Sequence, residues 1–169
     1  PYLPMQPGDM CTSAGKVIGR HDGLMFYTIG QRQGLRIGGR RDGDGSAWYV
    51  AGKDIAANRL ILVQGHDHPL LYARRLTCTR LSWISGTQPD ASRAYSAKTR
   101  YRQQDSTCRI VRCDESQCEI EFAARQWAIT PGQSVVLYDA ETWLSGGIIE
   151  GAKSDSADEA SLTHFARAE

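Results

Sequence analysis

The chain of 169 residues lacks any long apolar run, and this absence narrows the classes of protein to which it can belong. No stretch approaches the roughly 18–20 apolar residues that a membrane-spanning helix needs. The first nine residues have neither the basic start nor the apolar centre of a secretory signal peptide. Charged residues make up 23% and apolar residues 41% of the chain, which excludes a collagen, a coiled coil and a wholly disordered chain.

The cysteines follow no pattern of a disulfide framework or a zinc site. They number five, an odd count, and Cys108, Cys113 and Cys118 recur every five residues rather than in close Cys-x-x-Cys pairs. We therefore expect reduced thiols, no metal site and a cytoplasmic protein.

Motifs of self-contained catalysis are also missing. The glycine- and arginine-rich segment Gly30–Gly39 has neither the Gly-Lys-Ser/Thr of a P-loop nor the glycine spacing of a dinucleotide site. Its Arg32 and Arg36 could bind phosphate, or the glycines could simply permit an irregular turn. An independent enzyme using Cys11 and His21 would need Cys11 to be a low-pKa thiolate, and we assign no catalytic residue.

Charge is segregated along the chain, although the net charge is only +1. Basic residues prevail twice, in 16–41 and in 74–102, and acidic residues prevail from Glu150 to the end. Such blocks favour a polyanionic partner for the body of the protein, and the alternative is solvated basic strand faces.

Secondary-structure signals are mostly β. In the first part, Lys16–His21 and Leu24–Thr28 read as short strands or extended segments, and Thr28 could cap one helical turn through Gly30–Gly34. Trp48–Lys53 and Arg59–Gln64 form a predicted hairpin. The second arm of that hairpin is apolar on both faces, which indicates a strand buried on both sides.

Evenly spaced strands follow a boundary near Gly65–Pro69. Their number and spacing indicate a small closed barrel or sandwich. The predicted strands are Leu70–Ile84, Arg93–Arg102, Thr107–Cys113, Cys118–Ala123, Ser134–Tyr138 and Thr142–Ile149. We expect a central domain over 1–67 that includes a linker over 1–9, a barrel over 68–151 and a flexible tail over 152–169.

The predicted strand Arg93–Arg102 is the most informative element. Alternation places Lys98, Arg100 and Arg102 on one face, where phosphates of a nucleic acid could lie along them. Acidic neighbours such as Glu119 or Glu121 on an adjacent strand offer an equally good explanation.

Several segments, in this order, resemble the middle of the bacterial tRNA-specific 2-thiouridylase family. They are Gly19-Arg-His-Asp-Gly23, Tyr27–Gly39, Trp48-Tyr-Val50, Lys98-Thr-Arg-Tyr-Arg-Gln103, Thr130-Pro-Gly-Gln-Ser-Val135 and Gly146-Gly-Ile-Ile149. The resemblance covers about residues 1–151. It implies a mainly β chain, with a small irregular β-rich central domain and a six-stranded translation-factor-like β-barrel.

The resemblance also implies a function for the longer parent enzyme. Family members place sulfur on C2 of the wobble uridine of the tRNAs for Lys, Glu and Gln, using ATP and magnesium and a sulfur-relay protein. This chain has neither the family's PP-loop sequence nor its Ile-Cys-Phe motif, so we expect it to be inactive alone and to hold no cofactor. Ser145, where the family has glycine, and residues 123–126 depart from the family pattern.

We therefore interpret the chain as the tRNA-binding part of a 2-thiouridylase. The main expected contacts are Arg100, Tyr101 and Gln133, clustered at one end of the barrel, and the further ones are Lys98, Arg102 and Arg32. The alternative is a stand-alone translation-factor-like barrel that binds RNA or protein without chemistry.

Overall fold

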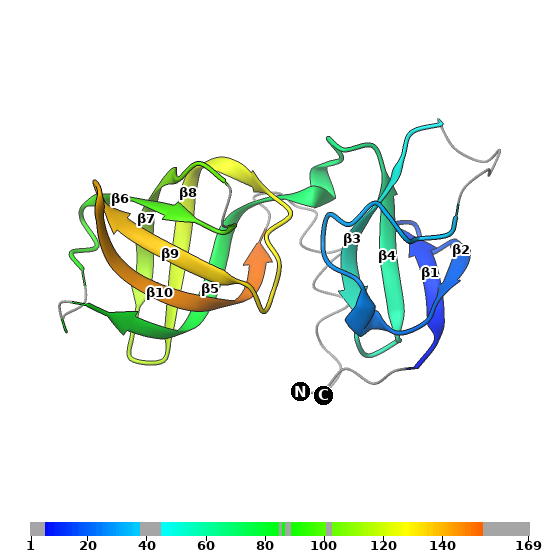
Figure 1. Ribbon diagram of the computed structural model, residues 1–169, viewed down its shortest axis with the longest axis horizontal. Coiled ribbons are helices and arrows are strands. Elements are labelled where there is room, and N and C mark those ends of the chain that lie inside the picture. Colours follow the sequence, from blue (N-terminus) through cyan, green and yellow to red (C-terminus); the bar gives the residue numbers. More distant parts are fainter. Residues whose placement is uncertain (1–5, 38–44, 85, 87–88, 101–102, 154–169) are drawn as a thin grey trace. The chain divides into compact units, whose positions relative to one another are not determined.

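The structure is a computed structural model that describes residues 6–37, 45–84, 86, 89–100 and 103–153. These residues form mainly β structure with almost no helix, as the sequence predicts, and make up two compact units that meet in the chain between Leu71 and Tyr72. We call them the mixed-sheet unit and the barrel (Figure 1). No helix among the described residues is both long and apolar enough to cross a membrane.

The mixed-sheet unit contains four strands in the order β2-β1-β4-β3. The strands are β1 (Gly8–Thr12), β2 (Val17–His21), β3 (Trp48–Asp54) and β4 (Arg59–Gln64). β1 runs parallel to β4, and the pairs β1–β2 and β3–β4 are antiparallel. The hairpin of β3 and β4 was predicted, whereas β1 begins within the proline-rich stretch that we interpreted as a linker.

β4 is the buried centre of this sheet. Leu60, Ile61, Leu62 and Val63 are each at most 4% exposed, which confirms the prediction of a strand buried on both faces. Leu60 and Leu62 pack in a core cluster with side chains of the other strands and of the loop before β3. The cluster also includes Met10, Ile18, Leu24, Tyr27, Leu35, Ile37 and Val50.

The loop between β2 and β3 differs from the prediction. Leu24–Phe26 is a short 3-10 helix (η1) rather than an extended segment, and no helical turn follows over Gly30–Gly34. The backbone of the loop pairs with β3 instead: Gly30 N donates to Val50 O at 2.8 Å, and Val50 N donates to Gln31 O at 3.0 Å. Bonds to a neighbouring strand therefore replace the bonds that a helical turn would make.

The barrel is closed by six antiparallel strands in the order β10-β5-β8-β7-β6-β9. It follows a short 3-10 helix, η2 (Pro69–Leu71). The strands are β5 (Tyr72–Trp83), β6 (Ala94–Lys98), β7 (Ser106–Cys113), β8 (Gln117–Trp127), β9 (Ser134–Asp139) and β10 (Thr142–Lys153). All six strands were predicted from the sequence, but each differs from its predicted range at one or both ends.

Alternating side chains fill the barrel interior. On β8, Cys118, Ile120 and Phe122 are at most 1% exposed, and on β6 Tyr95 and Ala97 are buried, with the period of two that a β-strand gives. The backbone also defines the turn before β9. Gly132 has φ +86° and Gln133 N donates to Thr130 O at 3.2 Å, as in a type II turn.

All five cysteines are free thiols. Burial raises the pKa of Cys108 and of Cys113 to about 12, and that of Cys11 above its usual value. A raised pKa keeps a cysteine in its poorly nucleophilic thiol form. The raised pKa of Cys11 therefore does not support an enzyme that uses this residue as a low-pKa nucleophile.

Candidate nucleic-acid interface

One end of the barrel brings together segments that are distant in sequence. β6 ends at Lys98, which pairs with Val136 near the start of the antiparallel strand β9. At the same end, β8 finishes at Trp127, which pairs with Tyr72 at the start of β5. The segments that leave β6 and enter β9 therefore lie around one rim.

Arg100 is fixed at this rim by two contacts. Its guanidinium carbon lies 5.0 Å from the centre of the Trp127 ring, and its Nη2 donates to Ala128 O at 3.0 Å. Burial lowers the pKa of Arg100 from its usual value, but an arginine remains charged at any physiological pH. These two contacts, one with an aromatic face and one with a backbone carbonyl, position the guanidinium at the rim.

The Ala128 carbonyl connects Arg100 to the turn that carries Gln133. Thr130 Oγ1 also donates to Ala128 O, at 3.0 Å, and Thr130 O in turn accepts from Gln133 N. Arg100 and Gln133 therefore lie at the same end of the barrel. We call Arg100, Trp127, Ala128, Thr130 and Gln133 the rim cluster.

Lys98 is the last residue of β6 and lies beside this rim. Its side chain is on the outer surface of the barrel. Its Nζ is 5.4 Å from the centre of the Tyr138 ring on β9. Thr99, the next residue, is 3% exposed and faces inward. The predicted alternation of Lys98 and Thr99 is confirmed, although the strand ends four residues before Arg102.

The other expected contacts are not part of the rim cluster as described. Tyr101 and Arg102 lie outside the described residues. Arg32 belongs to the mixed-sheet unit, where it lines a surface hollow.

A network of amide and hydroxyl groups supports the chain after β6. Thr99 Oγ1 donates to Gln103 Oε1 at 3.0 Å, and Gln103 Nε2 donates to Gln126 Oε1 at 2.9 Å. Ser106 Oγ donates to the same Gln126 oxygen at 3.1 Å. Sequence reasoning missed Gln126 and Trp127 as site residues, because their contacts reach past β7 to the segment after β6.

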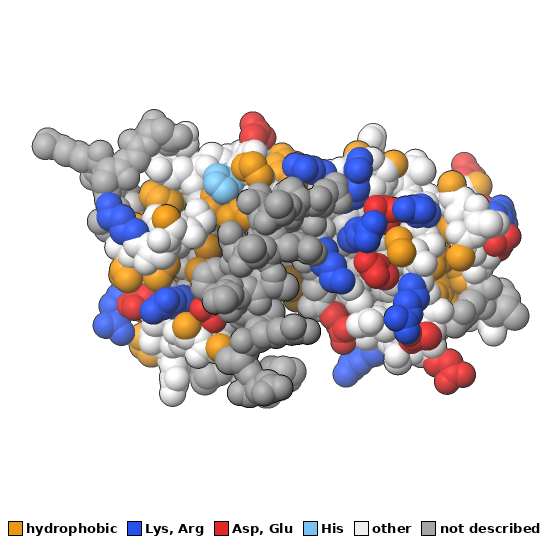
Figure 2. All heavy atoms as spheres, turned by 180° about the vertical axis from the view of Figure 1, so that it is seen from behind, with side chains coloured by type: hydrophobic (Ala, Val, Ile, Leu, Met, Phe, Trp, Pro, Cys, Tyr) orange, Lys and Arg blue, Asp and Glu red, His pale blue; other side chains and the backbone are white. Residues whose placement is uncertain are grey.

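Glu121, an acidic residue on the outer surface, pairs with arginines of the two strands beside β8. Glu121 accepts from Arg75 Nε at 3.0 Å and from Arg109 Nε at 2.6 Å, across the neighbouring strands β5 and β7. These bonds hold the pKa of Glu121 below its usual value. Figure 2 shows this side of the barrel, where basic and acidic side chains are interleaved. Glu121 thus pairs with Arg75 and Arg109, rather than balancing the basic residues of β6.

The described residues contain no group of three or more His, Cys, Asp or Glu side chains that could hold a metal ion. His21, which is buried, has its Nε2 3.1 Å from Asn58 O. His66 Nδ1 is 3.0 Å from Asp67 Oδ1 in an exposed turn. His21 and His66 therefore contact neighbouring protein groups, and the rim cluster is the stronger candidate site.

Two family models match this chain. The first, described as the tRNA methyl transferase PRC-barrel domain, covers residues 1–64, and the second, described as the aminomethyltransferase beta-barrel domain, covers residues 73–149. Together they span the mixed-sheet unit and the barrel.

Curated relatives are similar over most of this chain. The tRNA-specific 2-thiouridylase MnmA of Thiobacillus denitrificans is 57% identical over 148 residues, or 88% of this chain and 41% of the relative. The proteins of the same name from Cupriavidus metallidurans and Methylobacillus flagellatus are each 56% identical, over 88% and 89% of this chain and 42% of each relative. The chain thus spans about two fifths of the length of these relatives. By these matches the chain belongs to the tRNA-specific 2-thiouridylase family, of which it contains the central and C-terminal domains.

Proposed function

We propose that this chain is the tRNA-binding part of an enzyme that places sulfur on C2 of the wobble uridine of tRNA. The proposal rests on family membership and on one observation, the cation of Arg100 held over Trp127 at the barrel rim. The tRNAs for Lys, Glu and Gln are the proposed substrates. ATP, magnesium and a sulfur-relay protein are assigned to the longer parent enzyme.

The rim cluster suits the backbone of RNA. A guanidinium forms strong charge-assisted hydrogen bonds with phosphate, and one that is already positioned loses less conformational entropy on binding. Gln133 follows the turn at the same rim and can donate to a ribose or a base. Lys98 adds a positive charge beside the rim, and Tyr101 and Arg102 complete the proposed contacts.

Replacing Arg100 tests this proposal directly. We expect Arg100→Ala to weaken tRNA binding by about 1–3 kcal/mol, the range of a hydrogen bond to a charged group. Fluorescence anisotropy with labelled tRNA at fixed salt measures the change. The matched control is Arg93→Ala, because Arg93 precedes the other end of β6 and pairs with Asp139 at 2.8 Å. Equal losses in both variants would leave only a diffuse basic surface, and circular dichroism verifies that both fold.

A second test concerns catalysis. We expect the purified chain neither to hydrolyse ATP nor to thiolate tRNA. The ATP-binding residues are assigned to the part of the parent enzyme that this chain does not match. Phosphate release with and without tRNA measures the first activity. ATP consumption stimulated by tRNA would contradict the proposal that ATP is bound and used by another part of the parent enzyme.

A further inference from the structure

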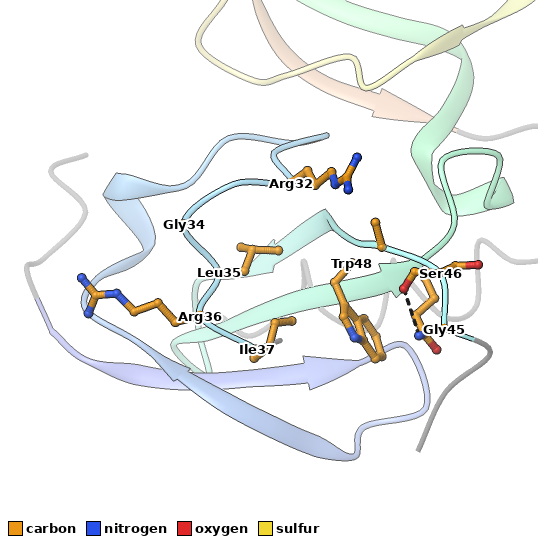
Figure 3. A pocket seen from close by; sticks show the side chains of 10 residues that line it. Arg32, Gly34, Leu35, Arg36, Ile37, Gly45, Ser46 and Trp48 are labelled. Carbon is orange, nitrogen blue, oxygen red and sulfur yellow. Dashed lines mark hydrogen bonds between the residues drawn. The ribbon is translucent and has the colours of Figure 1, made fainter. Parts of the chain in front are cut away.

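A hollow of about 310 Å³ opens in the mixed-sheet unit, away from the rim cluster in sequence and in a different unit. It lies where the loop after η1 passes the adjoining ends of β3 and β4 (Figure 3). Trp48 and Gln64 are directly opposite each other in the β3–β4 ladder and line the hollow together. The buried side chains of Leu35 and Ile37 contribute apolar lining.

Trp48 offers an aromatic surface to this hollow. It is half-buried, packing against the core cluster while still lining the hollow. A half-buried indole that is held by a core is a rigid platform on which a planar ring can stack.

Gln64 supplies a fixed hydrogen-bonding group beside the indole. Its Nε2 donates to Ser46 O at 3.2 Å, and this bond sets the orientation of the amide. The Gln64 Oε1 oxygen is thereby positioned to accept a hydrogen bond from a ligand.

Arg32 supplies the positive charge. Its side chain is exposed, and no acidic side chain in the described part of the chain pairs with it. Arg36 differs: it points away from the centre of the hollow in Figure 3, and its Nη1 lies 3.5 Å from Asp22 Oδ2. The two bonds between the backbones of Gly30, Gln31 and Val50 attach the loop to β3 just before Arg32.

We propose that this hollow binds one nucleotide of single-stranded RNA. The base stacks on Trp48 and donates to Gln64 Oε1, and Arg32 binds the phosphate. Unpaired bases in RNA are typically bound by aromatic stacking together with polar contacts to their edges. A free mononucleotide carries the same base and phosphate and could bind in the same way. Only the statement that the nucleotide belongs to an RNA chain rests on the proposed function.

Nuclear magnetic resonance titrations of the 169-residue chain test the hollow. We expect uridine monophosphate to shift the Trp48 indole N–H signal saturably, and pentauridylate to do so at lower concentration. Ribose 5-phosphate, which has no base, should bind about tenfold more weakly, within the range known for stacking of one base. Equal binding of ribose 5-phosphate, or no saturable shift of Trp48 with either nucleotide, would overturn the proposal. Tighter binding of the monophosphate than of pentauridylate would overturn the RNA source.

Variants distinguish binding in the hollow from nonspecific electrostatic attraction to the basic surface. Arg32→Gln should weaken binding of uridine monophosphate at least fivefold, whereas Arg59→Gln should leave it unchanged, because Arg59 is an exposed arginine at the opposite end of β4. Trp48→Phe, which keeps an aromatic ring, should retain binding, and its binding is followed by the backbone amide signals of the residues that line the hollow. Equal effects of the two arginine variants would overturn the proposal. tRNA binding by the unmodified chain is measured in parallel, so that loss of the proposed function and loss of the nucleotide site are distinguishable.

Discussion

Gly8 occupies a position where the surrounding atoms leave no room for a side chain. A Cβ at this residue would lie 2.1 Å from Asn58 O and 2.6 Å from His21 Nε2. These neighbours are themselves fixed, because His21 Nε2 contacts Asn58 O at 3.1 Å. Asn58 Nδ2 also donates to the carbonyl oxygens of Gln6 and Pro7. Asn58 thereby binds the chain that enters β1 to the turn between β3 and β4.

We expect Gly8→Ala to destabilise the mixed-sheet unit by about 1–3 kcal/mol or more, as overpacking of fixed groups does. Equilibrium unfolding in urea measures the loss. Gly52→Ala is the matched control, because a Cβ at Gly52 meets Ile61 only at an ordinary 3.8 Å. Similar midpoints for the two variants would show that the chain near Gly8 can move aside.

The contacts of single residues at the rim were predictable only in part. The family motifs selected Arg100 and Gln133, and the antiparallel pairing of β6 with β9 places both at one end. The stacking of Arg100 on Trp127 was not predictable, because β6 and β8 are separated by β7 in the barrel and the contact is made only beyond the strand end. A pattern within one strand carries no information on such a contact.

At the scale of elements, β5, β8 and β7 are joined across their outer faces by Glu121. Its carboxylate bonds Arg75 on one side and Arg109 on the other, and these bonds lower the pKa of Glu121. A carboxylate with a lowered pKa stabilises the fold fully above its unfolded pKa of about 4.3. That contribution is lost as the pH falls through the lower pKa of the folded state.

Glu121→Gln should therefore lower the thermal midpoint most at neutral pH. The difference between the variant and the unmodified chain should shrink as the pH is lowered from about 5 through the lowered pKa of the folded state. Calorimetric scans at several pH values measure it. Glu115→Gln, at an exposed residue of the turn between β7 and β8, serves as the control. A difference that stays constant with pH would contradict a role for the ionised carboxylate.

Strand identities were more predictable than strand ends. The spacing of the predicted strands and the turn signals between them predicted all six barrel strands. In the structure, Tyr95 and Ala97 on β6 face inward. The alternation continues to Arg102, so it could not show that β6 ends at Lys98. β1 was missed because prolines precede it and because its partners, β2 and β4, are set by tertiary pairing.

At the scale of the whole molecule, positive charge is present in both units, with Arg32 in one and Lys98 and Arg100 in the other. We expect tRNA binding to weaken steeply with salt, with a slope of log affinity against log salt of about 0.7–0.9 for each phosphate neutralised. Anisotropy titrations from low to moderate salt measure the slope. Arg100→Ala should reduce the slope by about one phosphate. Affinity that does not change with salt would contradict the electrostatic basis of binding.

Closure of the barrel has a consequence for self-association. Each of its six strands is paired on both sides, so none presents a row of unpaired amides to a second chain. The mixed sheet instead has two edge strands, β2 and β3. The bonds of Gly30 and Gln31 to Val50 occupy part of the β3 edge, and the exposed Val17 lies on β2. Among the described residues, β2 of the mixed-sheet unit is therefore the edge most open to pairing with a second chain, whereas the closed barrel offers none.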